Sequence, residues 1–320
     1  MDRTQDACVP TTPEPMKIFT NTSYSEPVKQ LLSEGTAGHQ CTDEISEAEI
    51  IFGFTDPATV KNAPALCWIQ VPAAGYEKYD NAEARAWLQE RGIVLTNSSS
   101  VYNEPCAQHV LAMMMALARR LPDSQQNQST TQAWPQWETR AETYLLAGQT
   151  VLLLSYGAIA RRLCELLAPL KLNLIAVRRT PTGDEPIKTI TEAELSAYLP
   201  TADHVVNILP ANPQTNDFVN AERFAAMKRG AKYYSIGRGT TTDQDALLAA
   251  LQTGQLSEAY LDVTNPEPLP AEHPLWKAPN CYLTPHTAGG HSNEQERLVK
   301  LFLENLKRFV AGEELQDRIV

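Results

Sequence analysis

The chain has 320 residues, of which 43% are hydrophobic and 20% are charged, so it is long enough and apolar enough to form two globular domains with separate cores. Its formal net charge of -11 argues against nucleic acid or an anionic membrane surface as the main partner. No apolar run approaches the roughly 20 residues of a membrane span, and residues 1–15 are polar, without the apolar stretch of a signal peptide, so we expect a cytoplasmic protein with a disordered tail over residues 1–15.

The first part of the chain alternates between short apolar runs and helical segments, which is typical of a small parallel α/β domain. Helices are expected near residues 26–34 and 82–91. Small residues, including Ala74 and Gly75, follow the third apolar run and can expose backbone N–H groups to an anion, although a plain turn explains them equally well. The predicted strands are 17–20, 50–54, 66–71 and 93–96.

A long apolar helix is expected over residues 104–120, with Asn103 as its N-cap. The polar Gln/Ser/Thr stretch that follows, residues 121–131, predicts a surface loop. Trp134 and Trp137 lie close to this loop, and the sequence allows them either to pack on a partner subunit or to pack locally.

Residues 150–179 have the pattern of a strand, a tight turn, an amphipathic helix and a second strand. In the turn, Ser155, Gly157 and Ala160 occupy the three positions of a G-x-G-x-x-G motif. Gly157 would let the backbone approach a pyrophosphate that binds at the helix N-terminus, whereas Ser155 departs from the motif. The turn therefore predicts a dinucleotide site, with an ordinary strand-to-helix turn as the alternative.

The alternation of strands and helices continues after residue 179 and predicts a second parallel sheet. Helices are expected at 192–197, 221–227, 243–253 and 293–310. Strands are expected at 204–209, 231–236, 259–261 and 281–283.

Glycines and functional side chains follow several of these strands, and in a parallel sheet ligands bind at the strands' carboxyl ends. Arg238, between two glycines, is suited to hold a carboxylate with two parallel hydrogen bonds. His286 is suited to general acid or base catalysis near neutral pH. Glu267 lies in a loop stiffened by two prolines. Considered alone, each of these three residues is also explained by a purely structural role. The residues at these strand ends are Gly157, Arg178, Pro210, Gly237, Arg238, Gly239, Asp262, Thr284, Pro285 and His286.

Taken together, these residues resemble the D-isomer-specific 2-hydroxyacid dehydrogenases. The order and intervals of Arg238, Glu267 and His286 match the catalytic Arg, Glu and His of that family. A looser similarity extends over nearly the whole chain from Met16. The segments that carry the resemblance are 235–239, 261–268 and 280–289.

The resemblance implies an α/β protein with two doubly wound parallel-sheet domains and an active site in the cleft between them. A Rossmann dinucleotide-binding domain, residues 104–288, would be inserted into a flavodoxin-like substrate domain, residues 16–103 and 289–320. The C-terminal helix would fold back to complete the substrate domain. Members of the family are commonly homodimers, so we expect a homodimer.

The resemblance also implies hydride transfer between a nicotinamide cofactor and a small 2-keto or D-2-hydroxy acid. His286 would give the proton, Glu267 would hold the far ring nitrogen and favour the imidazolium, and Arg238 would bind the substrate carboxylate. Backbone N–H groups of Ala74 and Gly75 would take the other carboxylate oxygen. Residues implied to contact the cofactor are Ala158, Ile159, Ile236, Asp262, Ala288 and Gly289.

Arg178 stands 21 residues after Gly157, where NAD-binding enzymes keep an acid for the ribose hydroxyls. Since Arg178 and Arg179 can pair with a 2′-phosphate, we expect NADP(H), with NAD(H) as the alternative. A weakly active or inactive relative that serves as a dinucleotide-sensing dimeric binding module is the competing interpretation. Ser155 supports it, and the complete Arg, Glu and His set opposes it.

The sequence specifies neither a metal site nor the substrate side chain. The six cysteines have no CxxC spacing and mostly lie in apolar runs, which favours buried reduced thiols over disulfides or metal ligands. For the pocket that receives the substrate side chain, Tyr76, Tyr102 and Trp276 are the candidates.

Overall fold

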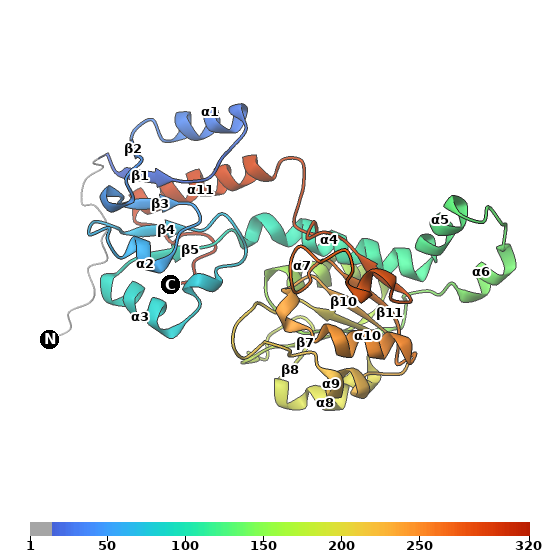
Figure 1. Cartoon of the computed structure of the whole chain (residues 1–320). Helices are drawn as coiled ribbons and strands as arrows, with labels where there is room; N and C mark the ends of the chain where they lie inside the picture. Colours follow the sequence, from blue (N-terminus) through green and yellow to red (C-terminus); the bar gives the residue numbers. More distant parts are fainter. Residues whose placement is uncertain (1–14) are drawn as a thin grey trace. The chain divides into compact units, whose positions relative to one another are not determined.

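The structure, a computed structural model, describes residues 15–320 (Figure 1). The tail expected over residues 1–15 lies outside the described residues, apart from Pro15. The chain divides into two compact units, Met1–Tyr102 with Gly290–Val320, and Asn103–Gly289. Within residues 15–320 all five cysteines are free thiols, and no helix is both long and apolar enough to cross a membrane.

The first unit is built on a five-stranded parallel sheet with the order β2-β1-β3-β4-β5, which is the flavodoxin-like order. Four of its strands follow the apolar runs in the sequence. Strand β2 was not expected, because its three residues, Gln-Cys-Thr, lie on the edge of the sheet with no buried side chain. The strands are β1 Lys17–Thr20, β2 Gln40–Thr42, β3 Ile50–Phe52, β4 Trp68–Gln70 and β5 Val94–Thr96.

A helix from the far end of the sequence completes the core of the first unit. The Phe302 ring stacks on Phe52, with ring centroids 4.3 Å apart, and on Trp68, at 5.3 Å. All three side chains are fully buried, so residues 290–320 supply part of the core around β3 and β4. The helices of this unit are α1 Glu26–Gly35, α2 Pro57–Val60, α3 Ala82–Arg91 and α11 Glu294–Ala311.

The second unit contains a seven-stranded parallel sheet with the order β12-β11-β10-β9-β6-β7-β8. From the β8 end this is the Rossmann order with one added strand, and the topological switch point lies between β6 and β9. The predicted fold class, two doubly wound parallel sheets, is confirmed. Strand β8 was missed because only one of its three residues is buried. The strands are β6 Thr150–Leu153, β7 Asn173–Val177, β8 Lys188–Ile190, β9 His204–Asn207, β10 Ala231–Ser235, β11 Leu256–Leu261 and β12 Cys281–Leu283.

Two predictions about helices were wrong. The long helix begins at Ser99, not Glu104, and contains Pro105, because Asn103 and the proline imitate a helix start inside the second turn. The expected loop over 121–131 is mostly helix α5, since glutamine has good helix propensity despite its polarity. The remaining helices are α4 Ser99–Ala118, α5 Leu121–Ser129, α6 Gln136–Glu142, α7 Ala158–Leu167, α8 Leu195–Tyr198, α9 Ala221–Ala226 and α10 Gln244–Gln252.

Candidate functional site

Three loops leave the same edge of the seven-stranded sheet, from the neighbouring strands β10, β11 and β12. Arg238 follows β10, Glu267 follows β11 and His286 follows β12. The carboxyl ends of these strands meet at one edge because the strands pair in parallel. The three residues that the sequence suggested as catalytic therefore lie in adjacent loops.

The imidazole of His286 is paired with the carboxylate of Glu267. The distance from His286 Nδ1 to Glu267 Oε2 is 2.8 Å, and the side chains are 52% and 37% exposed. The second carboxylate oxygen, Oε1, accepts the backbone N–H of Thr264 at 2.9 Å. With both oxygens engaged, the carboxylate has one orientation and sets that of the ring. The other ring nitrogen, Nε2, has no hydrogen-bond partner within residues 15–320.

The backbone of His286 has a φ of 54°, in the left-handed region that non-glycine residues rarely adopt. Two hydrogen bonds from its N–H hold this conformation, to the carbonyl oxygens of Asp262 at 2.9 Å and Thr284 at 3.0 Å. Unfavourable backbone geometry that the surroundings enforce is frequent at functional sites. Here it directs the imidazole toward Glu267.

A cavity of about 400 Å³ lies beside this pair, and both Glu267 and His286 line it. This volume is in the range of small-molecule sites. Trp276, one of the three candidates for the substrate pocket, lines the same cavity. Its indole N–H donates to the carbonyl oxygen of Pro270 at 2.8 Å, which fixes the ring. The apolar part of the wall consists of Pro268, Leu269, Trp276, Leu283 and Pro285.

The glycines on either side of Arg238 are required by close backbone contacts. A Cβ at Gly237 would come within 2.4 Å of the Leu209 carbonyl oxygen, and one at Gly239 within 1.9 Å of the Thr264 carbonyl oxygen. The Arg238 loop thus packs against the loop that carries Glu267. Arg238 itself is half-buried, and its Nη1 donates to the carbonyl oxygen of Gly237 at 2.8 Å.

Gly157 is the N-cap residue of α7, and no side chain of residues 15–320 caps this helix. Among the residues that the structure describes, a Cβ at Gly157 would meet only the Ser155 hydroxyl, 3.9 Å away, so they leave the space at this position open. The first N–H groups of a helix have no partner within the helix and attract anions. Gly157 at the end of β6 and Pro210 beyond β9 flank the switch point of the sheet. These features fit the pyrophosphate of a dinucleotide.

Comparison with known proteins agrees with this geometry. Residues 111–288 match a family model described as "D-isomer specific 2-hydroxyacid dehydrogenase, NAD binding domain", which is more than half of the chain. The chain belongs to the D-isomer-specific 2-hydroxyacid dehydrogenase family. The family resemblance inferred from the sequence is therefore confirmed, and the protein is an oxidoreductase with a nicotinamide-dinucleotide domain.

Relatives whose names state an activity align with most of this chain. It is 30% identical over 268 residues to a glyoxylate reductase of Pyrococcus horikoshii, covering 81% of this chain and 77% of that protein. It is 28% identical over 277 residues to glyoxylate/hydroxypyruvate reductase B of Citrobacter koseri, covering 83% of each. The crystal structure of a D-isomer-specific 2-hydroxyacid dehydrogenase family protein from Aeromonas salmonicida superposes with a TM-score of 0.74 at 27% identity, covering 95% of this chain and 99% of that one.

In this dehydrogenase, Arg178 at the end of β7 is paired with Glu185, an acid that no sequence motif indicated. Its Nη1 lies 2.5 Å from Glu185 Oε1, and the Glu185 side chain is only 4% exposed. The backbone N–H of Thr182, with further donors from the same loop, holds the pKa of Glu185 well below its usual range. Arg179, the second predicted contact for a 2′-phosphate, is exposed. No sequence signal distinguished Glu185 from any other loop acid.

Asp262, expected to contact the cofactor, is buried and holds the turn that carries His286. Its Oδ1 accepts the N–H of Thr287 at 2.8 Å and its Oδ2 accepts the N–H of Ala288 at 2.9 Å. Of the other expected cofactor contacts, Ile236 and Gly237 are buried at the end of β10, and Gly289 is half-buried.

Ala74 and Gly75, the expected substrate contacts, lie in the first unit in a loop after β4. Asn97 Nδ2 donates to the Ala74 carbonyl oxygen at 2.7 Å, which fixes the peptide. Within the described part of the chain the N–H groups of Ala74 and Gly75 have no hydrogen-bond acceptor. The loop therefore presents two oriented donors.

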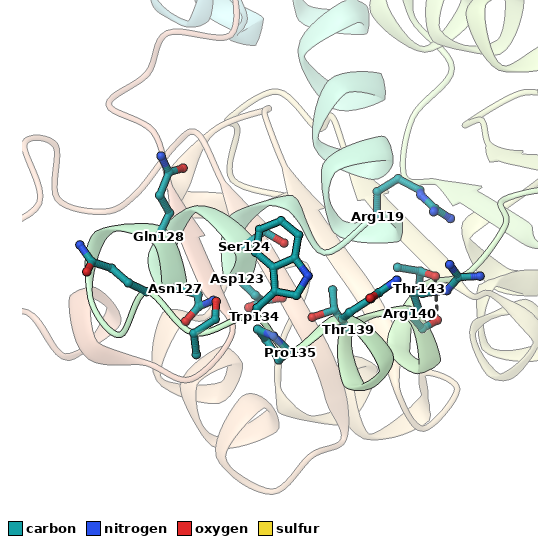
Figure 2. Close-up of a pocket in the computed structure, with 13 residues that line it drawn as sticks. Arg119, Asp123, Ser124, Asn127, Gln128, Trp134, Pro135, Thr139, Arg140 and Thr143 are labelled. Atoms are coloured by element: carbon teal, nitrogen blue, oxygen red, sulfur yellow. Dashed lines mark hydrogen bonds between the residues drawn. The ribbon is translucent and has the colours of Figure 1, made fainter.

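A second, larger cavity of about 1100 Å³ lies between α5 and α6 in the dehydrogenase's second unit. Figure 2 shows that the Trp134 side chain lies between these two helices. The indoles of Trp134 and Trp137 are 89% and 70% exposed. The lining includes no member of the predicted catalytic set, so this cavity is separate from the His286 site.

Proposed function

We propose that the protein reduces a small 2-keto acid to the D-2-hydroxy acid, or catalyses the reverse reaction, with NADP(H) as the preferred cofactor. The observation that carries the proposal is the pairing of His286 Nδ1 with Glu267 at 2.8 Å, on the wall of a small cavity. Glyoxylate and hydroxypyruvate are the first substrates to test, because two relatives are named for their reduction.

The reaction needs a hydride at C2 of the substrate and a proton on the carbonyl oxygen. The bound reduced nicotinamide supplies the hydride. His286 delivers the proton from Nε2, since Nδ1 is engaged with Glu267. The Glu267 carboxylate stabilises the charged imidazolium that donates and keeps its ring plane fixed. In the oxidative direction His286 takes the proton back as the base.

The substrate carboxylate needs cationic or N–H donors. Arg238 offers a planar guanidinium held in place by a rigid glycine-flanked loop, which suits two parallel hydrogen bonds. We assign the N–H groups of Ala74 and Gly75 to the other carboxylate oxygen. These donors select a 2-keto acid over a simple ketone, because without a carboxylate they would lose their partner.

The cofactor preference is assigned from the β7 end of the sheet. Arg178 shares its charge with Glu185, so the exposed Arg179 is the cation with more capacity for a 2′-phosphate. Gly157, Ala158 and Ile159 supply the helix N-terminus for the pyrophosphate. One NADP(H) molecule would place its pyrophosphate at the N-terminus of α7 and its 2′-phosphate near Arg179.

With purified protein and a panel of 2-keto acids, we expect turnover with NADPH and a Michaelis constant for NADH about 10-fold higher or more. Arg179→Ala should raise the constant for NADPH by about 10-fold and leave that for NADH unchanged. Arg229→Ala, an exposed arginine at the opposite end of β10, serves as the matched control. A lower constant for NADH would contradict the cofactor assignment. Dinucleotide binding without turnover of any keto acid would favour the binding-module alternative.

The α5–α6 segment supports the proposal of a homodimer. Residues 124–137 contain no charged residue, in a chain with 20% charged residues, and the segment extends away from the sheet (Figure 1). Exposed tryptophan with few charges is typical of interface cores. Uncharged surfaces also allow two identical copies to meet without repulsion.

Light scattering should give about twice the chain mass of 35.4 kDa for the wild type. Trp134→Ser combined with Trp137→Ser should shift the species to a monomer, because the exposed indoles would no longer bury their area on a second copy. Phe54→Ser, which removes another exposed aromatic ring, should remain dimeric. A monomeric wild type at micromolar concentration would rule the assignment out.

A further inference from the structure

A chain of side-chain hydrogen bonds runs from α4 to the turn that carries His286. His109 Nε2 bonds the Tyr260 hydroxyl, which bonds the Thr284 hydroxyl, which in turn bonds Asp262 Oδ1. The four residues come from α4, from β11 and its end, and from the residue after β12. None of His109, Tyr260 and Thr284 is needed for proton delivery or carboxylate binding in the proposed reaction.

The direction of this chain follows from its last member. A carboxylate only accepts, so the Thr284 hydroxyl donates to Asp262 and must accept from Tyr260. Tyr260 can donate because burial raises its pKa to about 12, which keeps the phenol protonated. The Tyr260 oxygen then accepts from the Nε2–H of His109. Every donor points toward Asp262, an arrangement in which each bond strengthens the next.

The chain ends on the backbone of the catalytic turn. Asp262 accepts the N–H groups of Thr287 and Ala288 with its carboxylate, and that of His286 with its backbone carbonyl. Asp262 is 2% exposed and Tyr260 is 1% exposed, so water does not replace a lost bond there. A phenylalanine would fill the space of Tyr260 as well, which indicates that packing alone does not explain the hydroxyl.

We propose that His109, Tyr260 and Thr284 are positioning residues that fix the Asp262 carboxylate and, through it, the left-handed backbone of His286. The inference rests on the proposed function only for its kinetic consequence, because the orientation of the turn can be measured without turnover. In the variant Thr284→Val, Asp262 Oδ1 loses its side-chain donor and keeps only the Thr287 N–H, so the turn gains freedom. Tyr260→Phe removes the preceding link, whereas Thr284→Ser keeps the hydroxyl.

Hydrogen exchange of the peptide that spans residues 284–290 is the direct test. Thr284→Val and Tyr260→Phe should accelerate exchange at the Thr287 and Ala288 amides by about 10-fold or more, and Thr284→Ser should match the wild type. In the reductase assay the first two variants should lower kcat by about 10- to 100-fold. Thr284→Ser should restore kcat.

Each outcome decides a separate point. Wild-type exchange in Thr284→Val would overturn the proposal, and so would faster exchange with an unchanged kcat. A loss in Thr284→Ser as large as that in Thr284→Val would show that the hydroxyl alone does not hold the turn, which also overturns the proposal. A wild type that turns over no keto acid would refute the proposed function. The hydrogen-exchange comparison would then still decide whether the hydrogen bonds from His109 to Asp262 fix the turn.

Discussion

His286→Ala should lower kcat for 2-keto acid reduction by about 10³-fold, with dinucleotide affinity unchanged. The reason is the fixed geometry of the site: Nδ1 is held by Glu267 at 2.8 Å, so Nε2 is the ring atom that can reach a substrate oxygen. Without the ring, the carbonyl oxygen would have to take its proton from water. Steady-state kinetics with glyoxylate and direct titration of NADPH would separate the two quantities.

Two further variants sharpen this test. Glu267→Gln should lower kcat by about 10²-fold, a smaller loss than removal of the imidazole, because the ring remains while its stabilising charge is gone. His273→Ala removes another imidazole, whose Nδ1 accepts the Leu275 N–H within the same segment after β11, and should keep wild-type kcat. Activity of His286→Ala close to wild type would remove the imidazole from the mechanism.

Arg238→Gln should lower kcat/KM for 2-keto acids by about 10³-fold, mainly through a higher Michaelis constant for the acid. Gln can form one neutral hydrogen bond where the guanidinium forms two charged ones. Arg238→Lys should recover only part of the loss, because an ammonium lacks the planar pair of donors. The loop should survive each change, since Gly237 and Gly239 make its close backbone contacts and remain in place.

The matched control for Arg238 is Arg223→Gln, an arginine of the same unit that pairs with Glu192 on the surface. It should leave kcat/KM unchanged. A carbonyl substrate without a carboxylate adds a second check, since its turnover should be slow in the wild type and no slower in Arg238→Gln. If Arg238→Gln affected both substrates equally, the arginine would have a role other than carboxylate binding.

The central strands and the loops after them could be predicted because their sequences are locally distinctive. A strand buried on both faces, such as β3 or β6, consists largely of an unbroken apolar run, and the residues that follow it mark the ligand-binding edge. The edge strands β2 and β8 carry no such signal, since one face or both are open to water. The true start of α4 was hidden by a proline that the helix tolerates near its beginning.

At the site, the sequence predicts residues that belong to one motif but not the contacts that the fold creates between distant residues. The pairing of His286 with Glu267 could be anticipated because a family motif fixes their interval. The contacts of Arg178 with Glu185, and of His109 with Tyr260, depend on which residues the fold brings together. Glu185 looks like any loop acid, and His109 lies on an apolar helix where a structural imidazole is the ordinary expectation. Such residues differ from their neighbours only in the contacts that the folded protein gives them.

The contribution of α11 to the first unit has a consequence for biosynthesis. As the ribosome releases the polypeptide, Phe302 emerges only after Phe52, Trp68 and the whole segment from Asn103 to Gly289. The segment from Asn103 to Gly289 is continuous and can fold as soon as it leaves the exit tunnel. The core around β3 and β4 cannot be completed before α11 is synthesised, so the Phe52 and Trp68 rings lack their stacking partner until then.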